Sequence, residues 1–179
     1  VRVSTDSSGA QANSSSYSPI FSADGTQVAF HSNARNLVEG DTNGAMDIFV
    51  KNLSTGVVTR VSTDSSGTQG NGSISYSPVF SADGTQVAFI SDASNLVEGD
   101  TNGTMDIFVK NLSTGVVTRV STDSSGAQAN GYSDHPVFSA DGKQVAFSSS
   151  ANNLVEGDTN GTRDIFVKNL STGVVTRVS

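Results

Sequence analysis

Residues 18–30 read SPIFSADGTQVAF, and the same pattern returns at residues 77–89 and 135–147 with only a few changes. In each copy, two runs rich in apolar residues flank a Ser-Ala-Asp-Gly turn. The Asp-Gly pair accepts the positive φ angles of a tight hairpin turn. The stretch therefore predicts a β-hairpin, with strands at residues 19–22 and 27–31 in the first copy.

A second hairpin follows in the sequence DIFVKNLSTGVVTRVS, which occupies residues 47–62, 106–121 and 164–179 without a single change. Its first part predicts a strand at residues 47–51, and its last part, rich in β-branched residues, predicts a strand at residues 57–62. No segment places apolar residues at helical spacing. The fold class expected is all-β, with four short antiparallel strands in each repeat.

The whole chain consists of three such repeats. The motif DTNG begins at Asp41, Asp100 and Asp158, which lie 59 and 58 residues apart. We therefore expect residues 1–179 to form a single repeat domain. Its three units would span approximately residues 1–62, 63–121 and 122–179.

The central strands of each repeat carry apolar side chains on both faces. Val28 and Phe30 point away from Ala29, and Ile48 points away from Phe49. Four-stranded antiparallel sheets that recur at a fixed period and bury both faces stack radially as propeller blades. A linear β-solenoid is the competing stack, but its rungs are usually shorter and more uniform. The sequence favours a β-propeller.

The hairpin motif quoted above, together with DIFVKNLSTG, resembles the TolB-type propeller repeat, a relative of the WD-type repeat. Alanine stands at Ala23, Ala82 and Ala140 where that family usually has proline before Asp-Gly. The resemblance implies a six-bladed ring, and propellers need roughly four to eight blades to close. Three four-stranded blades would therefore be half of a ring, and we expect two chains to complete it as a homodimer.

The long loop within each repeat contains oxygen donors at alternating positions. In the first repeat these are Glu39, Asp41, Asn43 and Asp47, with the main-chain carbonyl of Ala45 as a further donor. Such spacing suits Ca²⁺, which prefers carboxylate, amide and carbonyl oxygens. The loop resembles the calcium loops of integrin-type propellers and the head of an EF-hand. The equivalent residues are Glu98, Asp100, Asn102, Thr104 and Asp106 in the second repeat, and Glu156, Asp158, Asn160, Thr162 and Asp164 in the third.

The sequence thus predicts one calcium ion per blade. Either Glu39 and its counterparts take part, or Asp41, Asn43 and Asp47 and their counterparts coordinate the ion without them. The alternative is that Asp41 and Asn43 form Asx turns and that Asp47 accepts backbone N–H bonds at the start of its strand. The charge count supports metal, because nine of the 17 acidic residues fall in these three loops and lie close together on one rim. Three calcium ions would offset most of the net charge of −7.

Composition narrows the function. A net charge of −7 disfavours nucleic acid, and no apolar run is long enough for membrane insertion. The chain has no cysteine, and its two histidines, His31 and His135, each occur in one repeat only. A nucleophilic catalytic site needs a base beside the nucleophile, and three near-identical blades disfavour an asymmetric active site. We therefore expect a non-enzymatic module.

The function that this sequence predicts is a calcium-binding structural or protein-interaction scaffold that assembles with itself. A protein partner would dock on the face that carries the long loops. Loops with weak calcium affinity suit compartments rich in calcium, which favours an extracellular or periplasmic location. The alternative is a designed or recently amplified repeat scaffold with no metal and no selected ligand.

Overall fold

The computed structural model describes all 179 residues and folds each repeat into one four-stranded antiparallel sheet. The first sheet contains β1 (Ser16–Phe21), β2 (Gln27–Ser32), β3 (Asp47–Asn52) and β4 (Val58–Arg60). The second contains β5 (Ser75–Phe80), β6 (Gln86–Ser91), β7 (Asp106–Asn111) and β8 (Val117–Arg119). The third contains β9 (Ser133–Phe138), β10 (Gln144–Ser149), β11 (Asp164–Asn169) and β12 (Val175–Arg177). In every sheet the strands lie in chain order, so each sheet is a simple meander.

The strand boundaries differ from the prediction at the two outer strands. β1 begins three residues earlier than expected and contains a bulge between Tyr17 and Ile20, where Ser18 has a φ of 49°. β4 ends at Arg60 rather than two residues later. The chain still pairs once more, from the Val61 N–H to the Ile48 carbonyl at 2.7 Å, and then turns back on itself.

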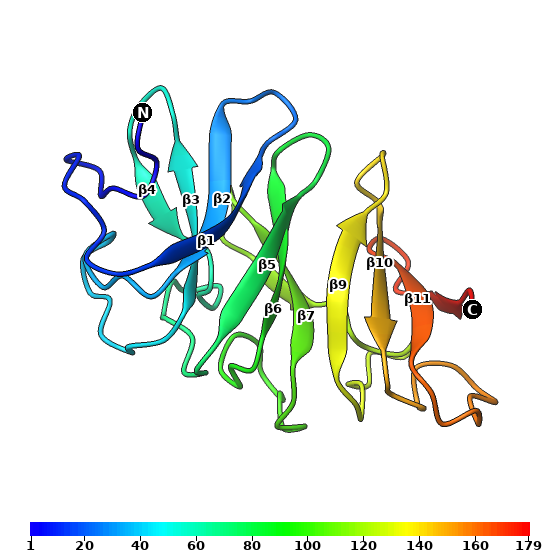
Figure 1. Ribbon diagram of the computed structural model, residues 1–179. Helices are drawn as coiled ribbons and strands as arrows, with labels where there is room; N and C mark the ends of the chain where they lie inside the picture. The colour runs from blue at the N-terminus through cyan, green and yellow to red at the C-terminus, as the bar shows by residue number, and fades with distance from the viewer.

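The three sheets lie side by side as blades, with a hydrophobic layer between each neighbouring pair (Figure 1). In the middle blade, Val87 and Phe89 face the first blade, whereas Ala88 and Ile90 face the third. All four side chains are buried. The expectation that both faces of a sheet must be covered is confirmed for this blade, and the fold is an all-β array of three propeller blades.

The strand connections separate onto two rims. Figure 1 shows the short turns between the first and second strands of each blade along the top, and the long connections along the bottom. The strands nearest the common axis are β1, β5 and β9, and β5 contacts both of the others. None of the chain forms a helix that could cross a membrane.

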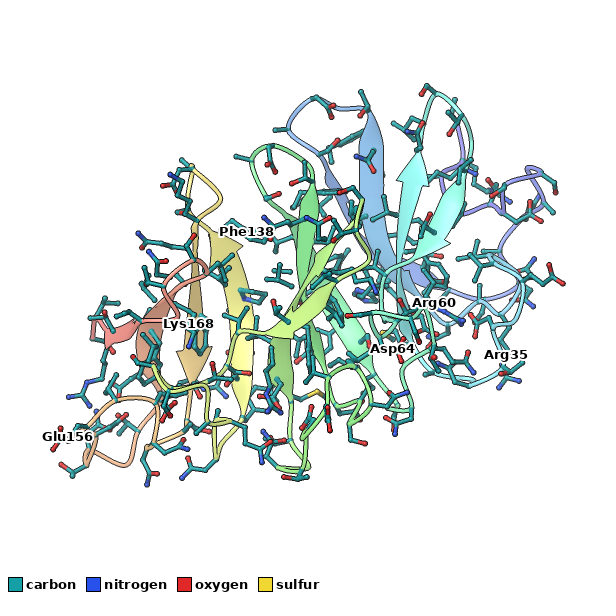
Figure 2. The ribbon with its side chains drawn as sticks, turned by 180° about the vertical axis from the view of Figure 1, so that it is seen from behind. Arg35, Arg60, Asp64, Phe138, Glu156 and Lys168 are labelled. Carbon is teal, nitrogen blue, oxygen red and sulfur yellow. The ribbon has the colours of Figure 1, made fainter.

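A buried lysine joins each blade to the segment that enters it. Lys110 of β7 donates hydrogen bonds from Nζ to the Thr63 carbonyl, the Thr63 hydroxyl and the Asp64 carbonyl, at 3.1, 2.9 and 2.6 Å. Lys51 and Lys168 make the same three contacts in their blades, and Figure 2 labels Lys168. Three oxygen acceptors around an ammonium compensate for its removal from water. The lysines therefore hold each connecting segment against the outer part of the next blade.

Candidate functional site

The long-loop rim of each blade brings two of the predicted acidic residues together around an arginine. In the first blade, Arg60 Nη1 lies 3.4 Å from Asp41 Oδ1 and 3.9 Å from Asp47 Oδ2. Both carboxyl groups are buried, and the Ser62 hydroxyl donates a 2.5 Å hydrogen bond to Asp47 Oδ1. Arg60 follows the loop on the last strand of the blade, so the β3–β4 hairpin places the cation over the acids.

The same arrangement occurs in the other two blades. Arg119 Nη1 lies 3.0 Å from Asp100 Oδ1 and 3.9 Å from Asp106 Oδ2, and Arg177 Nη1 lies 2.9 and 3.7 Å from the corresponding oxygens of the third blade. Burial raises the pKa of Asp106 to about 6 despite the hydrogen bond from Ser121. Burial also raises the pKa of three equivalent carboxyl groups, those of Asp41, Asp47 and Asp100.

The arginines change the charge balance of the rim from the one that the sequence led us to expect. The aspartates of the rim are partly compensated, because each pair of aspartates has its own guanidinium. The sequence contained the signal, since an arginine follows each DTNG motif at the same distance, at Arg60, Arg119 and Arg177. It was missed because this arginine belongs to the second hairpin, and only the fold brings that hairpin over the loop.

The other predicted ligands fall into two groups. The asparagines form Asx turns, with the Asn43 side-chain oxygen accepting a 3.0 Å hydrogen bond from the Ala45 N–H. Thr104 and Thr162 make the equivalent contact through their backbone N–H groups. The glutamates stay apart. Glu39, Glu98 and Glu156 are exposed and form no hydrogen bond or ion pair, and Figure 2 shows Glu156 at the outer tip of its loop.

This donor set fits a calcium ion only in part. Asp41 Oδ1 and Asp47 Oδ2 are buried without a hydrogen-bond donor, which leaves two carboxylate oxygens facing the same region. One guanidinium nitrogen lies near both of them, however, and no group of three or more His, Cys, Asp or Glu side chains has a metal-binding arrangement. A metal ion bound here would have to displace the arginine or share the two carboxylates with it.

The rim also connects neighbouring blades. Gln69, from the segment after the first blade, accepts a 2.9 Å hydrogen bond from Arg60 Nη1 and donates a 2.7 Å hydrogen bond to the Thr42 hydroxyl. The Asn43 amide donates to the Gly70 carbonyl at 3.0 Å. Gln128 repeats the first two contacts between the second and third blades. The rim therefore couples each blade to the next one along the chain.

A second polar cluster lies in the third blade alone, and the sequence patterns did not identify it. Asp134, which is buried, accepts a hydrogen bond from the Ser148 hydroxyl and lies 2.8 Å from His135 Nδ1. Arg163 donates to its other oxygen at 2.7 Å, and the guanidinium lies 5.1 Å from the centre of the Tyr132 ring. These contacts keep the pKa of Asp134 below its usual value although burial acts to raise it.

Comparison with known proteins shows the fold without naming a family. A scan of protein-family models and a search of curated proteins give no match. Among solved structures, the chain is similar to TolB from Acinetobacter baumannii, with 23% identity, a TM-score of 0.56, and coverage of 93% of this chain and 32% of the other. A putative TolB from Agrobacterium tumefaciens has 20% identity, a TM-score of 0.58, and coverage of 91% and 48%.

The β-propeller domain of the Trilobed protease from Pyrococcus furiosus is also similar, with 13% identity, a TM-score of 0.57, and coverage of 91% and 41%. The chain has a β-propeller fold. It spans less than half the length of each of these three structures. An oligogalacturonate lyase, an acylaminoacyl peptidase and prolyl endopeptidases are similar to it as well, so this likeness does not assign a catalytic activity.

Proposed function

We propose that this chain is a scaffold module that closes a six-bladed ring with a second copy of itself. The observation that carries the proposal is a difference in exposure between equivalent residues. Phe80 faces the first blade and is 8% exposed, whereas Phe21, its counterpart on the free face of the first blade, is 63% exposed. At the other end Ile165 is 41% exposed, whereas its counterparts Ile48 and Ile107 are completely buried.

The two free faces are therefore the two halves of an interface that already occurs twice inside the chain. If the third blade of one copy packed on the first blade of the other, Ile165 would occupy the place that Ile107 has between the second and third blades. Phe21 would occupy the place of Phe80. A twofold pair makes this contact twice, which closes a ring and leaves no free face.

An arginine at the third blade and a glutamine before the first blade would also complement each other across the junction between chains. Arg60 and Arg119 each donate from Nη1 to a glutamine of the following segment, Gln69 or Gln128. Arg177 Nη1 has no hydrogen-bond acceptor of this kind, and Gln11, the equivalent glutamine before the first blade, is exposed. In the proposed ring, Gln11 of the partner subunit would supply the acceptor.

Ring closure has one structural requirement. Residues 2–4 repeat the sequence Arg-Val-Ser of residues 177–179, and Val178 already pairs with the Ile165 carbonyl at 2.9 Å. Only one of the two copies of this tripeptide fits at each closed junction. We therefore expect residues 1–4 to leave their position when the ring closes, and a chain without them to dimerise at least as tightly.

The test is the mass of the chain in solution, measured by light scattering across a range of concentrations. We expect a dimer that the replacement Ile165→Asp converts to a folded monomer, because a charge would replace an apolar side chain at the centre of each junction. The matched control is Val116→Asp. Val116 is 50% exposed, and its counterparts Val57 and Val174 are 50% and 51% exposed, so this position lies outside every junction.

A monomeric parent chain would overturn the proposal. It would favour the alternative of an amplified or designed scaffold without a selected partner. A dimer that both substitutions leave intact would also overturn it, because the contact would then lie elsewhere on the molecule.

We keep calcium as a second candidate for the first blade, because Asp41 Oδ1 and Asp47 Oδ2 are buried without a donor. Calcium binding to the folded state would raise the midpoint of thermal unfolding, and a chelator would lower it. The variant Asp41→Asn should lose the calcium response. An unchanged midpoint after chelation and after calcium addition would leave the arginine as the only cation at this rim.

The remaining proposals follow from the scaffold function. We propose a non-catalytic role, with the long-loop face as the surface for a protein partner and an extracellular or periplasmic location in the calcium-bound case. Pull-down with the assembled ring tests the partner. Loss of capture when Glu39, Glu98 and Glu156 are replaced by glutamine would support docking on this exposed face.

A further inference from the structure

The two junctions inside the chain use the same backbone contact. At the first junction, Met46 donates from its N–H to the Ser73 carbonyl at 3.2 Å and accepts from the Ser75 N–H at 2.7 Å. At the second junction, the Met105 carbonyl accepts from the Ser133 N–H at 3.0 Å. The residue just before the third strand of one blade thus pairs with the start of the first strand of the next blade.

The side chains around these backbone contacts are mainly apolar or aromatic. At the second junction, Tyr76 and Met105 pack with Ile90 in the core between the blades, and the Tyr76 hydroxyl lies 2.5 Å from the Tyr132 hydroxyl of the third blade. The first junction has Tyr17, His31 and Met46 at the matching positions, with Ile74 in place of Tyr132.

The free face of the third blade replaces this whole set by polar residues. Asp134 stands at the position of Tyr76, Ser148 at that of Ile90, and Arg163 at that of Met105. The three form one hydrogen-bonded group, in which Asp134 accepts from both Ser148 and Arg163. Three of the differences between the third repeat and the second therefore fall on residues that touch one another.

The complementary position at the start of the first blade is also polar. Ser15 matches Ile74 and Tyr132, and it is exposed. The Ser15 carbonyl accepts from the Asn33 N–H as the Tyr132 carbonyl accepts from the Ser150 N–H, so the two backbones are equivalent. The first and third blades are therefore both polar at this one part of the junction, beside the apolar part that contains Ile165 and Phe21.

We propose that Asp134, Ser148 and Arg163 form a docking surface for the segment around Ser15 of a second copy, and that this polar match determines which blades join. The proposal rests on the ring closure proposed above. These residues would then determine specificity. The junction between two chains would be polar at this position, whereas the two junctions within a chain are apolar or aromatic there.

The physical reason is the cost of a mismatched junction. If the third blade met Ile74 or Tyr132 of another chain, the half-exposed Arg163 guanidinium would lose water without gaining a polar neighbour. If Ser15 met a Tyr76-type surface, a small polar side chain would leave a gap in an apolar layer. In both mismatched junctions a blade of one chain would take the place of a blade within another chain. Such exchange leads to open arrays rather than closed rings.

The experiment is a double-mutant cycle on the dimer, with dissociation constants measured by dilution. The variant Ser15→Tyr copies the third blade's Tyr132 onto the first blade. The triple variant Asp134→Tyr, Ser148→Ile, Arg163→Met copies the second blade's apolar face onto the third. We expect each change alone to weaken the dimer about tenfold or more, and the combination to restore it to within about threefold of the parent.

A second pair of variants keeps the test decisive if the triple variant does not fold. Ser15→Thr preserves the hydroxyl and should leave the dimer unchanged, whereas Ser15→Tyr should weaken it. Effects of Ser15→Tyr that are the same in both backgrounds, or equal dimer stability for Ser15→Tyr and Ser15→Thr, would overturn the proposal. A parent chain that is monomeric at every concentration would overturn ring closure itself. The dilution measurement on the parent chain detects this outcome separately from the effects of the variants.

Discussion

Single residues decide how charge is buried in this protein. Arg119 lies beside two carboxyl groups in the interior of the rim, and the pKa of one of them, Asp106, is raised to about 6 mainly by burial. A carboxylate that loses its only nearby cation in such a place keeps the full cost of its removal from water. Each blade thus depends on its arginine more than a surface ion pair would suggest.

We predict that Arg119→Met destabilises the folded chain by about 3–5 kcal/mol, the usual cost of breaking a buried ion pair by removing one partner. Chemical denaturation would measure the change. The control is Arg2→Met, since Arg2 occupies the equivalent place before the first blade but is exposed and forms no ion pair. Equal effects of the two substitutions would show that the rim arginine has no special role.

A second prediction concerns His31, which is 8% exposed, has no hydrogen-bond partner at Nδ1, and lies against Tyr17. Burial lowers the pKa of His31 below its usual 6.5. The unfolded chain therefore binds the proton more readily than the folded chain, so the stability that depends on neutral His31 is present above pH 6.5 and is lost as the pH falls below it.

The variant His31→Ile takes the residue that the second blade has at this position, Ile90. Thermal unfolding of both proteins between pH 8 and pH 5 should show that the variant is the more stable and that its advantage increases toward pH 5. A constant difference across this range would mean that the imidazole does not titrate on unfolding.

At the scale of elements, the chain relies on contacts that link strands to the loops between blades. The β7 strand holds the segment after β4 through Lys110, whose burial lowers the pKa of its ammonium group. Hydrogen bonds to charged groups contribute roughly 1.5–3 kcal/mol each, and their loss leaves buried acceptors unpaired. The lysine therefore fixes the position of an otherwise irregular segment.

Replacing Lys110 by methionine should destabilise the protein by at least about 2 kcal/mol, because the apolar stem is kept while all three hydrogen bonds are lost. Hydrogen exchange should accelerate first between Asp64 and Thr68, where backbone protection depends on this anchor. Lys143→Met is the control, since Lys143 is exposed in a hairpin turn. Protection that is unchanged at residues 64–68 would contradict the anchoring role.

Most of the strands, but not the bulge in the innermost strand of each blade, could be predicted from the sequence. The two hairpins of each repeat were predicted from turn residues and β-branched runs, because these signals are local. The bulge at Ser18 was not, and neither were its equivalents at Ser77 and His135, which also have positive φ angles. A non-glycine residue seldom takes this conformation, and none of these three positions carries the glycine that would signal it in the sequence.

For the whole molecule, the central question is how three blades protect two apolar end faces. A single chain that pairs with a copy gains stability by association, so its unfolding midpoint should rise with protein concentration. A tandem chain that carries two copies should close the ring within one molecule. We predict that its midpoint is higher than that of the single chain and independent of concentration.

Differential scanning calorimetry over a hundredfold range of concentration would measure both proteins. The tandem chain with Ile165→Asp in each copy is the control, and it should lose the added stability. A single chain whose midpoint does not change with concentration, and equals that of the tandem chain, would show that three blades are stable without a partner.

The sequence alone determined the repeat, the all-β class, the four strands of each blade and the stacking of blades, because hydrophobic alternation and turn chemistry act over a few residues and recur three times. It also located the acidic loops. Only the tertiary structure placed Arg60 over Asp41 and brought Asp134 and Arg163 together, since each pair joins the long loop to a strand whose position beside that loop depends on the folded blade. The calcium ions stay a prediction for the same reason: donor spacing along a chain does not determine which cation, metal or guanidinium, the folded loop holds.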